Sequence, residues 1–203
     1  MTKDHWFWQI KVILGLFLAA AIYGFFYFET SNLLNIIVAI IAVVTYAWAI
    51  FQKTEVPAAA SKREIAILFT LYLGFYSLYN LLYGVGAQLA LVMLAVWLLV
   101  SVLFIILLIL DKINTILAHP LFWTFSALIG LIILEIFLSL SFWPIDPKIK
   151  SLILVVIFYL TTNLIYLYTH NMLKFKKIIG FLIVSFLILG LFILSLWLSL
   201  KGG

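Results

Sequence analysis

The chain alternates long apolar stretches with short polar linkers, and this pattern predicts a bundle of membrane-spanning helices. An α-helix crosses the hydrocarbon core of a bilayer in roughly 17–25 apolar residues. The linkers hold all four prolines and nearly all of the charged side chains. We therefore expect an all-α, polytopic transmembrane helix bundle whose seven spans cover about residues 8–28, 33–51, 65–83, 87–110, 121–142, 151–169 and 178–200.

Composition supports lipid as the main solvent of this chain. Its residues are 67% hydrophobic and 9% charged, whereas soluble domains are about 45–50% apolar and about 25% charged. The linkers are too short for a soluble domain, so residues 1–203 are expected to form a single integral membrane domain. The absence of cysteine excludes disulfides, thiol catalysis and thiolate metal sites.

The distribution of basic residues predicts an orientation in the membrane. The side that carries the N-terminus collects nine of the twelve Lys and Arg residues, and the other side keeps Lys148, Lys150 and Lys201. Positive charge favours the inner side of a membrane. We expect the N-terminus inside and the C-terminus outside, in a multi-pass protein of the cytoplasmic (plasma) membrane. This topology explains the net charge of +5 without a nucleic acid partner.

The predicted third span carries a stripe of polar side chains. Its tyrosines recur at steps of four, three and four residues, which places them on one face of a helix, at Tyr72, Tyr76, Tyr79 and Tyr83. Asn80 lies beside this stripe. A hydroxyl or amide without a partner in hydrocarbon costs a few kcal/mol. The stripe is therefore expected to face other helices or a wet cavity.

A second polar stripe is predicted in the sixth span, at Tyr159, Thr162, Asn163 and Tyr166. Residues 75–83 and 158–166 share Phe, Tyr, Asn, Leu and a final Tyr at matching positions. One hypothesis is an inverted repeat of three plus three spans followed by one further helix, an arrangement common in transporters. The alternative is chance, because the chain is rich in Leu, Tyr and Phe.

Glu135 is the only acidic residue inside a predicted span. An ionisable side chain at such a depth is costly and marks a candidate functional site. Counted from the outer ends of the helices, its depth equals that of Tyr76 and Tyr79. We hypothesise that Glu135 meets Tyr76, Tyr79, Asn80 and Tyr83 in an outer-half polar pocket. The alternative is a neutral glutamic acid that is hydrogen-bonded for structural reasons.

Candidate catalytic or metal chemistry is weak in this sequence. His119, His170 and Asp111 lie near the predicted inner surface, but their spacing matches no compact set of metal ligands. An enzyme acting on lipid through these residues is the least favoured class. We predict no catalytic residue, no metal and no cofactor.

Two functions fit these observations. The first is a small channel or transporter that moves an ion or small polar solute through a pathway lined by the Tyr/Asn stripes and Glu135. The alternative is a non-catalytic structural or accessory subunit of a larger membrane complex. The expected partners are membrane lipid and either further copies of this chain or other membrane subunits.

Overall fold

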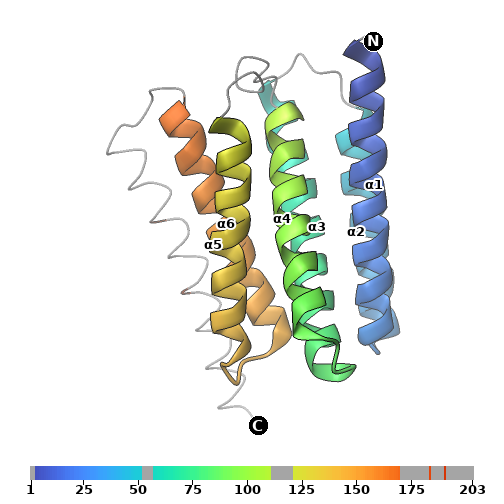
Figure 1. The fold of residues 1–203 in the computed structure, drawn as a ribbon. Coiled ribbons are helices and arrows are strands. Elements are labelled where there is room, and N and C mark those ends of the chain that lie inside the picture. The colour runs from blue at the N-terminus through green and yellow to red at the C-terminus, as the bar shows by residue number, and fades with distance from the viewer. Residues whose placement is uncertain (1–2, 52–56, 111–120, 170–182, 184–189, 191–203) are drawn as a thin grey trace. The chain divides into compact units, whose positions relative to one another are not determined.

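The computed structural model describes residues 3–51, 57–110, 121–169, 183 and 190. The described residues form helices and contain no strand, which confirms the all-α class (Figure 1). The helices are α1 (Lys3–Phe28), α2 (Asn32–Phe51), α3 (Pro57–Gly84), α4 (Leu89–Leu110), α5 (Leu121–Ser141) and α6 (Pro147–Thr169).

Five of these helices contain apolar stretches long enough to cross a membrane, and the protein is therefore an integral membrane protein. The stretches are Lys11–Phe28, Glu64–Gly84, Leu89–Leu107, Trp123–Ser141 and Pro147–Ile165. The second predicted span is helical, but its apolar part, Asn32–Ala47, is shorter. The seventh predicted span, 178–200, lies outside the described residues except at positions 183 and 190. The number of seven spans and the orientation remain predictions.

The chain divides into two compact units, Met1–Val155 and Val156–Gly203, with the division inside α6. In the first unit, α3 packs against α1, α2 and α4, and α5 packs against α4. The contact of α1 with α3 is the most extensive of these. Within this unit α3 is therefore the central helix, which agrees with the low exposure of most of its side chains.

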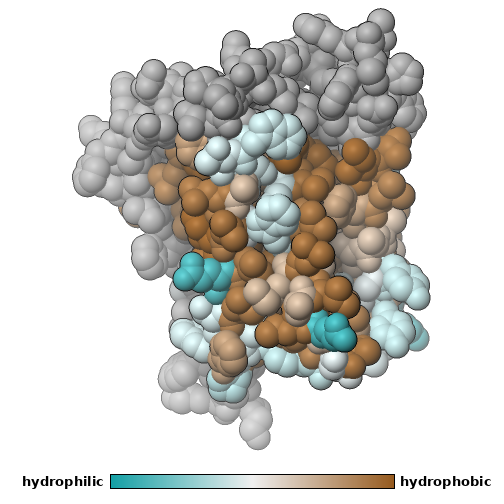
Figure 2. Space-filling view, viewed as in Figure 1, coloured by the Kyte–Doolittle hydropathy of each residue, from teal (hydrophilic) through white to brown (hydrophobic). Residues whose placement is uncertain are grey.

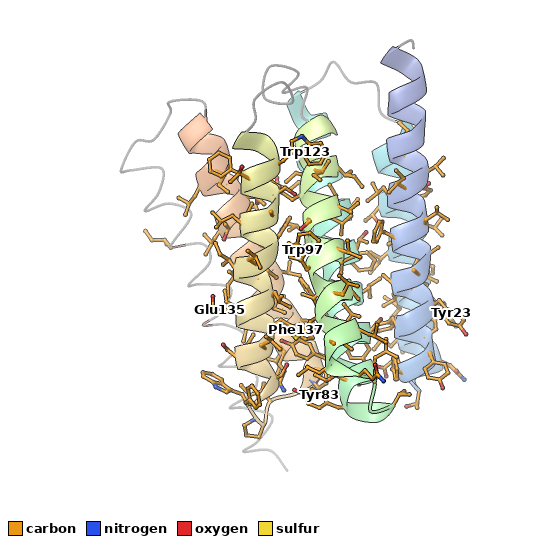
Figure 3. The ribbon with its side chains drawn as sticks, in the orientation of Figure 1. Tyr23, Tyr83, Trp97, Trp123, Glu135 and Phe137 are labelled. Carbon is orange, nitrogen blue, oxygen red and sulfur yellow. The ribbon has the colours of Figure 1, made fainter. Side chains whose placement is uncertain are left out.

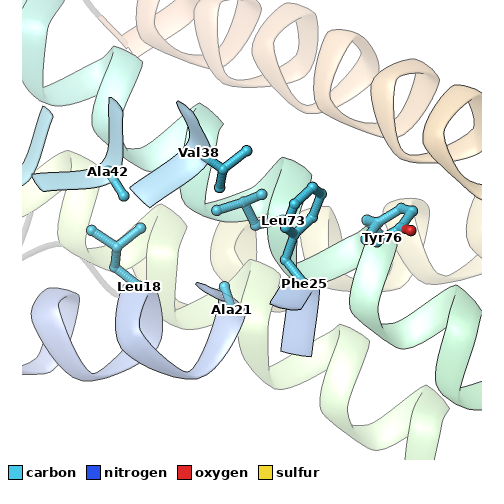
Figure 4. Close-up of a cluster of buried hydrophobic side chains, with 7 residues drawn as sticks. All are labelled: Leu18, Ala21, Phe25, Val38, Ala42, Leu73 and Tyr76. Atoms are coloured by element: carbon cyan, nitrogen blue, oxygen red, sulfur yellow. The ribbon is translucent and has the colours of Figure 1, made fainter. Parts of the chain in front are cut away.

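One part of the core fills the space between α1, α2 and α3. Its buried members are Leu18, Ala21, Phe25, Val38, Ala42, Leu73 and Tyr76 (Figure 4). On α1, three of these recur at steps of three and four residues, so they share the helix face turned toward the core. The ring of Phe25 lies 5.0 Å from that of Tyr76. This packing fixes the face that α3 presents to its neighbours.

Two glycines allow helices to approach closely. A Cβ at Gly24 of α1 would lie 2.6 Å from Ser77 Oγ of α3, and a Cβ at Gly130 of α5 would lie 2.5 Å from Ser101 Oγ of α4. Both distances are too short for a side chain. Small residues at helix contacts are typical of membrane proteins, because dispersion forces and interhelical hydrogen bonds hold the helices together.

Hydroxyl groups reinforce the contact between α4 and α5. Ser126 Oγ donates to the carbonyl oxygen of Ser101 at 3.1 Å, and Ser101 Oγ donates in return to the carbonyl oxygen of Ser126 at 3.5 Å. Both serines are buried. Their hydroxyls are therefore satisfied between helices without water.

Candidate functional site: a polar cluster at the helix ends

Charged and hydroxyl side chains gather in the first unit where α1, α3 and α5 end and α6 begins. We call this group the polar cluster, and it consists of Glu29, Tyr76, Tyr79, Tyr83, Ser141, Lys148 and Lys150. The chain folds this way because α1 ends just before Glu29 and because Asp146 caps α6, accepting a 2.7 Å hydrogen bond from the Lys148 amide. Pro147 then occupies the first helical position, which suits proline.

Lys150 is the most deeply buried charge of the polar cluster, with 3% of its surface exposed. Its Nζ donates a 3.0 Å hydrogen bond to the hydroxyl of Tyr83. The same ammonium lies 4.6 Å from the ring centroid of Tyr83 and 5.5 Å from that of Tyr79. Aromatic faces attract a cation, and the attraction grows when water is excluded. The two tyrosines therefore stabilise the positive charge of Lys150.

The same tyrosines connect α3 to α5. The Tyr79 hydroxyl donates to the carbonyl oxygen of Phe137 at 3.1 Å, and the Tyr83 hydroxyl donates to the carbonyl oxygen of Ser141. The ring of Tyr79 stacks on that of Phe137, with centroids 4.2 Å apart. Figure 3 shows Phe137 and Tyr83 near this end of the bundle. Both hydroxyls are thus used in contacts between helices.

Glu29 and Lys148 form an ion pair with 2.8 Å between Oε2 and Nζ. The Tyr76 hydroxyl donates to the same carboxylate at 3.4 Å. The hydrogen bond from Lys148 lowers the pKa of Glu29 below its usual value, although partial burial acts in the opposite direction. Lys148 stands in the first turn of α6, where the helix dipole disfavours a positive charge. Glu29 lies between the C-terminus of α1 and the N-terminus of α2, where its carboxylate also accepts a 3.4 Å hydrogen bond from the Ser31 amide. Pairing with Glu29 offsets the unfavourable position of Lys148.

The structure brings part of the predicted site together. Tyr76 and Tyr79 are buried, Tyr72 is half-buried and Tyr83 is partly exposed. The Asn80 amide is turned along its own helix, where it donates to the carbonyl oxygen of Tyr76 at 2.8 Å. The third-span stripe therefore faces other helices over most of its length.

The structure does not bring Glu135 to the polar cluster. Its side chain is exposed on α5, between the buried residues Ile133 and Phe137. In Figure 3 it projects from α5 on the side away from α3 and α4. The reason is helical geometry, because two residues along an α-helix correspond to roughly half a turn. In the described bundle, Lys150 and Glu29 occupy the place predicted for this acid.

The second predicted stripe lies in the second unit. Thr162 is buried, and both its hydroxyl and the amide of Asn163 donate to the carbonyl oxygen of Tyr159 at 2.9 Å. The side chain of Tyr166 lies outside the described residues, as do Asp111, His119 and His170. Within the described part of the chain, no group of three or more His, Asp or Glu residues is placed to hold a metal ion.

The sequence contains a signal for Lys150 that charge counting missed. Lys148 and Lys150 indicated only the outer side of the membrane. Lys150, however, precedes the buried residues Leu154 and Phe158 at steps of four, so it continues the buried face of α6 into the first turn. A lysine on that face must either be stabilised inside the bundle or displace the helix.

The fold and this site define an integral membrane protein whose helices are joined by polar contacts at one end. Residues 40–195 match the family described as "Protein of unknown function (DUF5656)", and the chain belongs to that family. The matched region contains every member of the polar cluster except Glu29. No curated protein and no solved structure matches the chain.

Proposed function

We propose that this membrane protein is a non-catalytic subunit of a larger membrane assembly, in which the outward face of α5 packs against a span of another chain. Glu135 carries the proposal. It lies six residues before Ser141, the end of α5, which is about 9 Å along the helix axis. It thus belongs to the membrane-spanning stretch Trp123–Ser141. An exposed carboxyl group in hydrocarbon is destabilising by several kcal/mol unless a neighbour hydrogen-bonds it.

The surroundings of Glu135 favour a protein neighbour. The exposed residues Leu128, Leu131, Glu135 and Ser139 recur at steps of three and four along α5. We call these four residues the α5 stripe. An apolar stripe with one carboxyl and one hydroxyl can bury its leucines against a second helix, while a polar group of that helix binds the carboxyl. Interhelical hydrogen bonds of this kind contribute about 1 kcal/mol or less in membranes.

The contacts of the polar cluster also favour an assembly subunit over the channel or transporter predicted from the sequence. A residue that lines a pathway keeps polar atoms available to solute. Tyr79 and Tyr83 instead use their hydroxyls to hold α3 against α5, and Tyr76 binds Glu29. Transport through a Tyr/Asn-lined pathway remains a prediction, which flux measurements test.

The proposal retains the topology derived from the basic residues. With the N-terminus inside the cytoplasmic membrane, the polar cluster lies at the outer surface. Glu135 then lies in the outer half of the bilayer. The partner of the α5 stripe is either another subunit or a second copy of this chain, and both provide a membrane span at the required depth.

Photocrosslinking in native membranes tests this proposal. A photoreactive amino acid at position 135 is expected to produce a crosslink to another chain. The matched control places the same probe at Leu94, an exposed position of α4, where crosslinks to lipid should dominate. A crosslink from position 135 only to residues 178–200 of the same chain would overturn the proposal, because the partner would then be internal.

A second experiment separates assembly from transport. Glu135→Leu is expected to weaken the complex several-fold in mild detergent, whereas Glu135→Gln should preserve it, since an amide still forms hydrogen bonds. The purified chain in proteoliposomes should show no ion flux above that of empty vesicles. Flux that depends on Glu135 and Tyr79 would replace the assembly role with a transport role.

A further inference from the structure

An apolar cleft of about 500 Å³ lies between α1, α3 and α4 in the first unit. Helix α3 packs extensively against both α1 and α4, whereas α1 and α4 contact each other much less. The cleft therefore lies between α1 and α4, and α3 forms its floor. Small residues on all three helices line it, among them Ala20, Gly24, Gly74 and Ala95. The face on which α1 and α4 lie is largely hydrophobic (Figure 2).

The length of the cleft matches one leaflet of a bilayer. Its lining on α1 extends from Phe17 to Phe28, which is about 16 Å at 1.5 Å per residue. It reaches the end of the bundle, where Val85 in the turn between α3 and α4 also lines it. The hydrocarbon core of a bilayer is about 30 Å thick. The cleft thus runs from one membrane surface to about the midplane.

The chemistry of the lining selects an uncharged occupant. The lining residues carry no charge, and their hydroxyls belong to Tyr23, Tyr27 and Ser77. Ser77 Oγ already donates to the carbonyl oxygens of Leu73 and Ala21, at 2.8 and 3.3 Å. Tyr23 and Tyr27 are strongly exposed near the end of α1, at the depth where tyrosines contact lipid headgroups.

We propose that this cleft binds one acyl chain of a diacyl membrane lipid, drawn from the leaflet that meets the end of α1 at Phe28. A hydrocarbon chain extends through one leaflet, as the cleft does, and needs no hydrogen-bond donor. A transmembrane helix of another protein is about 10 Å wide and crosses both leaflets. Such a helix would extend well beyond the cleft, which ends near the midplane.

Native mass spectrometry of the purified full chain tests this inference. The wild-type protein, extracted in a mild detergent, is expected to retain one diacyl lipid under activation that removes loosely bound lipid. Ala20→Phe places a ring in the cleft and should reduce the lipid-bound fraction at least tenfold. Its matched control, Ala19→Phe, alters an exposed neighbour on α1 that does not line the cleft. This control should retain the lipid.

A second pair of variants approaches the cleft from α4. Ala95→Phe fills it from the opposite wall and should also release the lipid, whereas Ala90→Phe, at an exposed position outside the lining, should not. Circular dichroism must show equal helix content for all four variants. Retention of no lipid by the wild type, or equal lipid loss from lining and control variants, would overturn the proposal. Lipid retention by Glu135→Leu separates this result from the assembly proposal.

Discussion

Removal of single hydroxyl groups from α3 should destabilise the bundle in a defined order. The two α3 variants are Tyr83→Phe and Tyr79→Phe, the control is Tyr23→Phe, and each retains its aromatic ring. The Tyr83 hydroxyl accepts a hydrogen bond from Lys150 and donates one to the carbonyl oxygen of Ser141. The Tyr79 hydroxyl donates only to the carbonyl oxygen of Phe137. Tyr23 on α1 is exposed and serves as the control.

The expected magnitudes follow from these partners. A neutral hydrogen bond contributes about 0.5–1.5 kcal/mol, and one to a charged group about 1.5–3 kcal/mol. The loss of stability in Tyr79→Phe should lie at the lower end of the range for a neutral hydrogen bond, because Ser141 Oγ still donates to the Phe137 carbonyl oxygen at 2.8 Å. The loss of stability in Tyr83→Phe should lie in the range for a hydrogen bond to a charged group, because the buried ammonium of Lys150 loses its hydroxyl partner. Tyr23→Phe should change the free energy of unfolding by about zero, since surface substitutions are usually within roughly 0.5 kcal/mol.

Thermal unfolding in nanodiscs of fixed lipid composition measures this order. For a chain of this length, 1 kcal/mol shifts Tm by about 2–4 °C. We expect Tm to fall by about 1–2 °C for Tyr79→Phe and by about 3–12 °C for Tyr83→Phe. In a double-mutant cycle with Lys150→Met, the Tyr83→Phe effect should shrink markedly. A Tyr83→Phe variant as stable as Tyr23→Phe would refute this account of the polar cluster.

Two further predictions concern helix packing and pH. Gly130→Ala should lower the free energy of unfolding by about 1–3 kcal/mol, because its Cβ meets Ser101 and overpacks the contact. The control in the same melting assay is Gly84→Ala, whose Cβ has only an ordinary 3.8 Å contact with Phe28. Because the folded-state pKa of Glu29 is lowered, its pairing with Lys148 stabilises the protein fully above the unfolded pKa and is lost as pH falls through the folded pKa. The Tm difference between wild type and Lys148→Met should therefore be full at pH 7 and shrink as pH falls below the ordinary pKa of a glutamate, about 4.3, and a difference independent of pH would contradict the ion pair.

The sequence predicted helices reliably but placed some of their starts too late. Apolar stretches of spanning length correspond to α1, α3, α4, α5 and α6. Helix α3 begins at Pro57 instead of residue 65, and α6 begins at Pro147 instead of residue 151. In both cases the proline was assigned to a linker. Proline lacks only an N–H group that the first turn does not use, so it is equally suited to start a helix.

The candidate site was only partly predictable. The spacing of Tyr76 and Tyr79 correctly indicated an inward stripe, because one helix face can be read from sequence. The partners of that stripe could not be read, since they depend on which helix ends meet. The hypothesis for Glu135 rested on depth in the membrane, which says nothing about direction around the helix axis. In the structure, Ile133 and Phe137 are buried two residues away on either side, so Glu135 lies on the opposite face of α5.

The two outward surfaces of the first unit differ in what the membrane can supply to them. Lipid chains can fill the cleft between α1 and α4, because its lining is uncharged and the hydroxyl of Ser77 is already bonded. Lipid chains cannot satisfy the carboxyl group of Glu135, because hydrocarbon offers no hydrogen-bond donor. The same physical rule therefore assigns a lipid to the cleft and a protein partner to the α5 stripe.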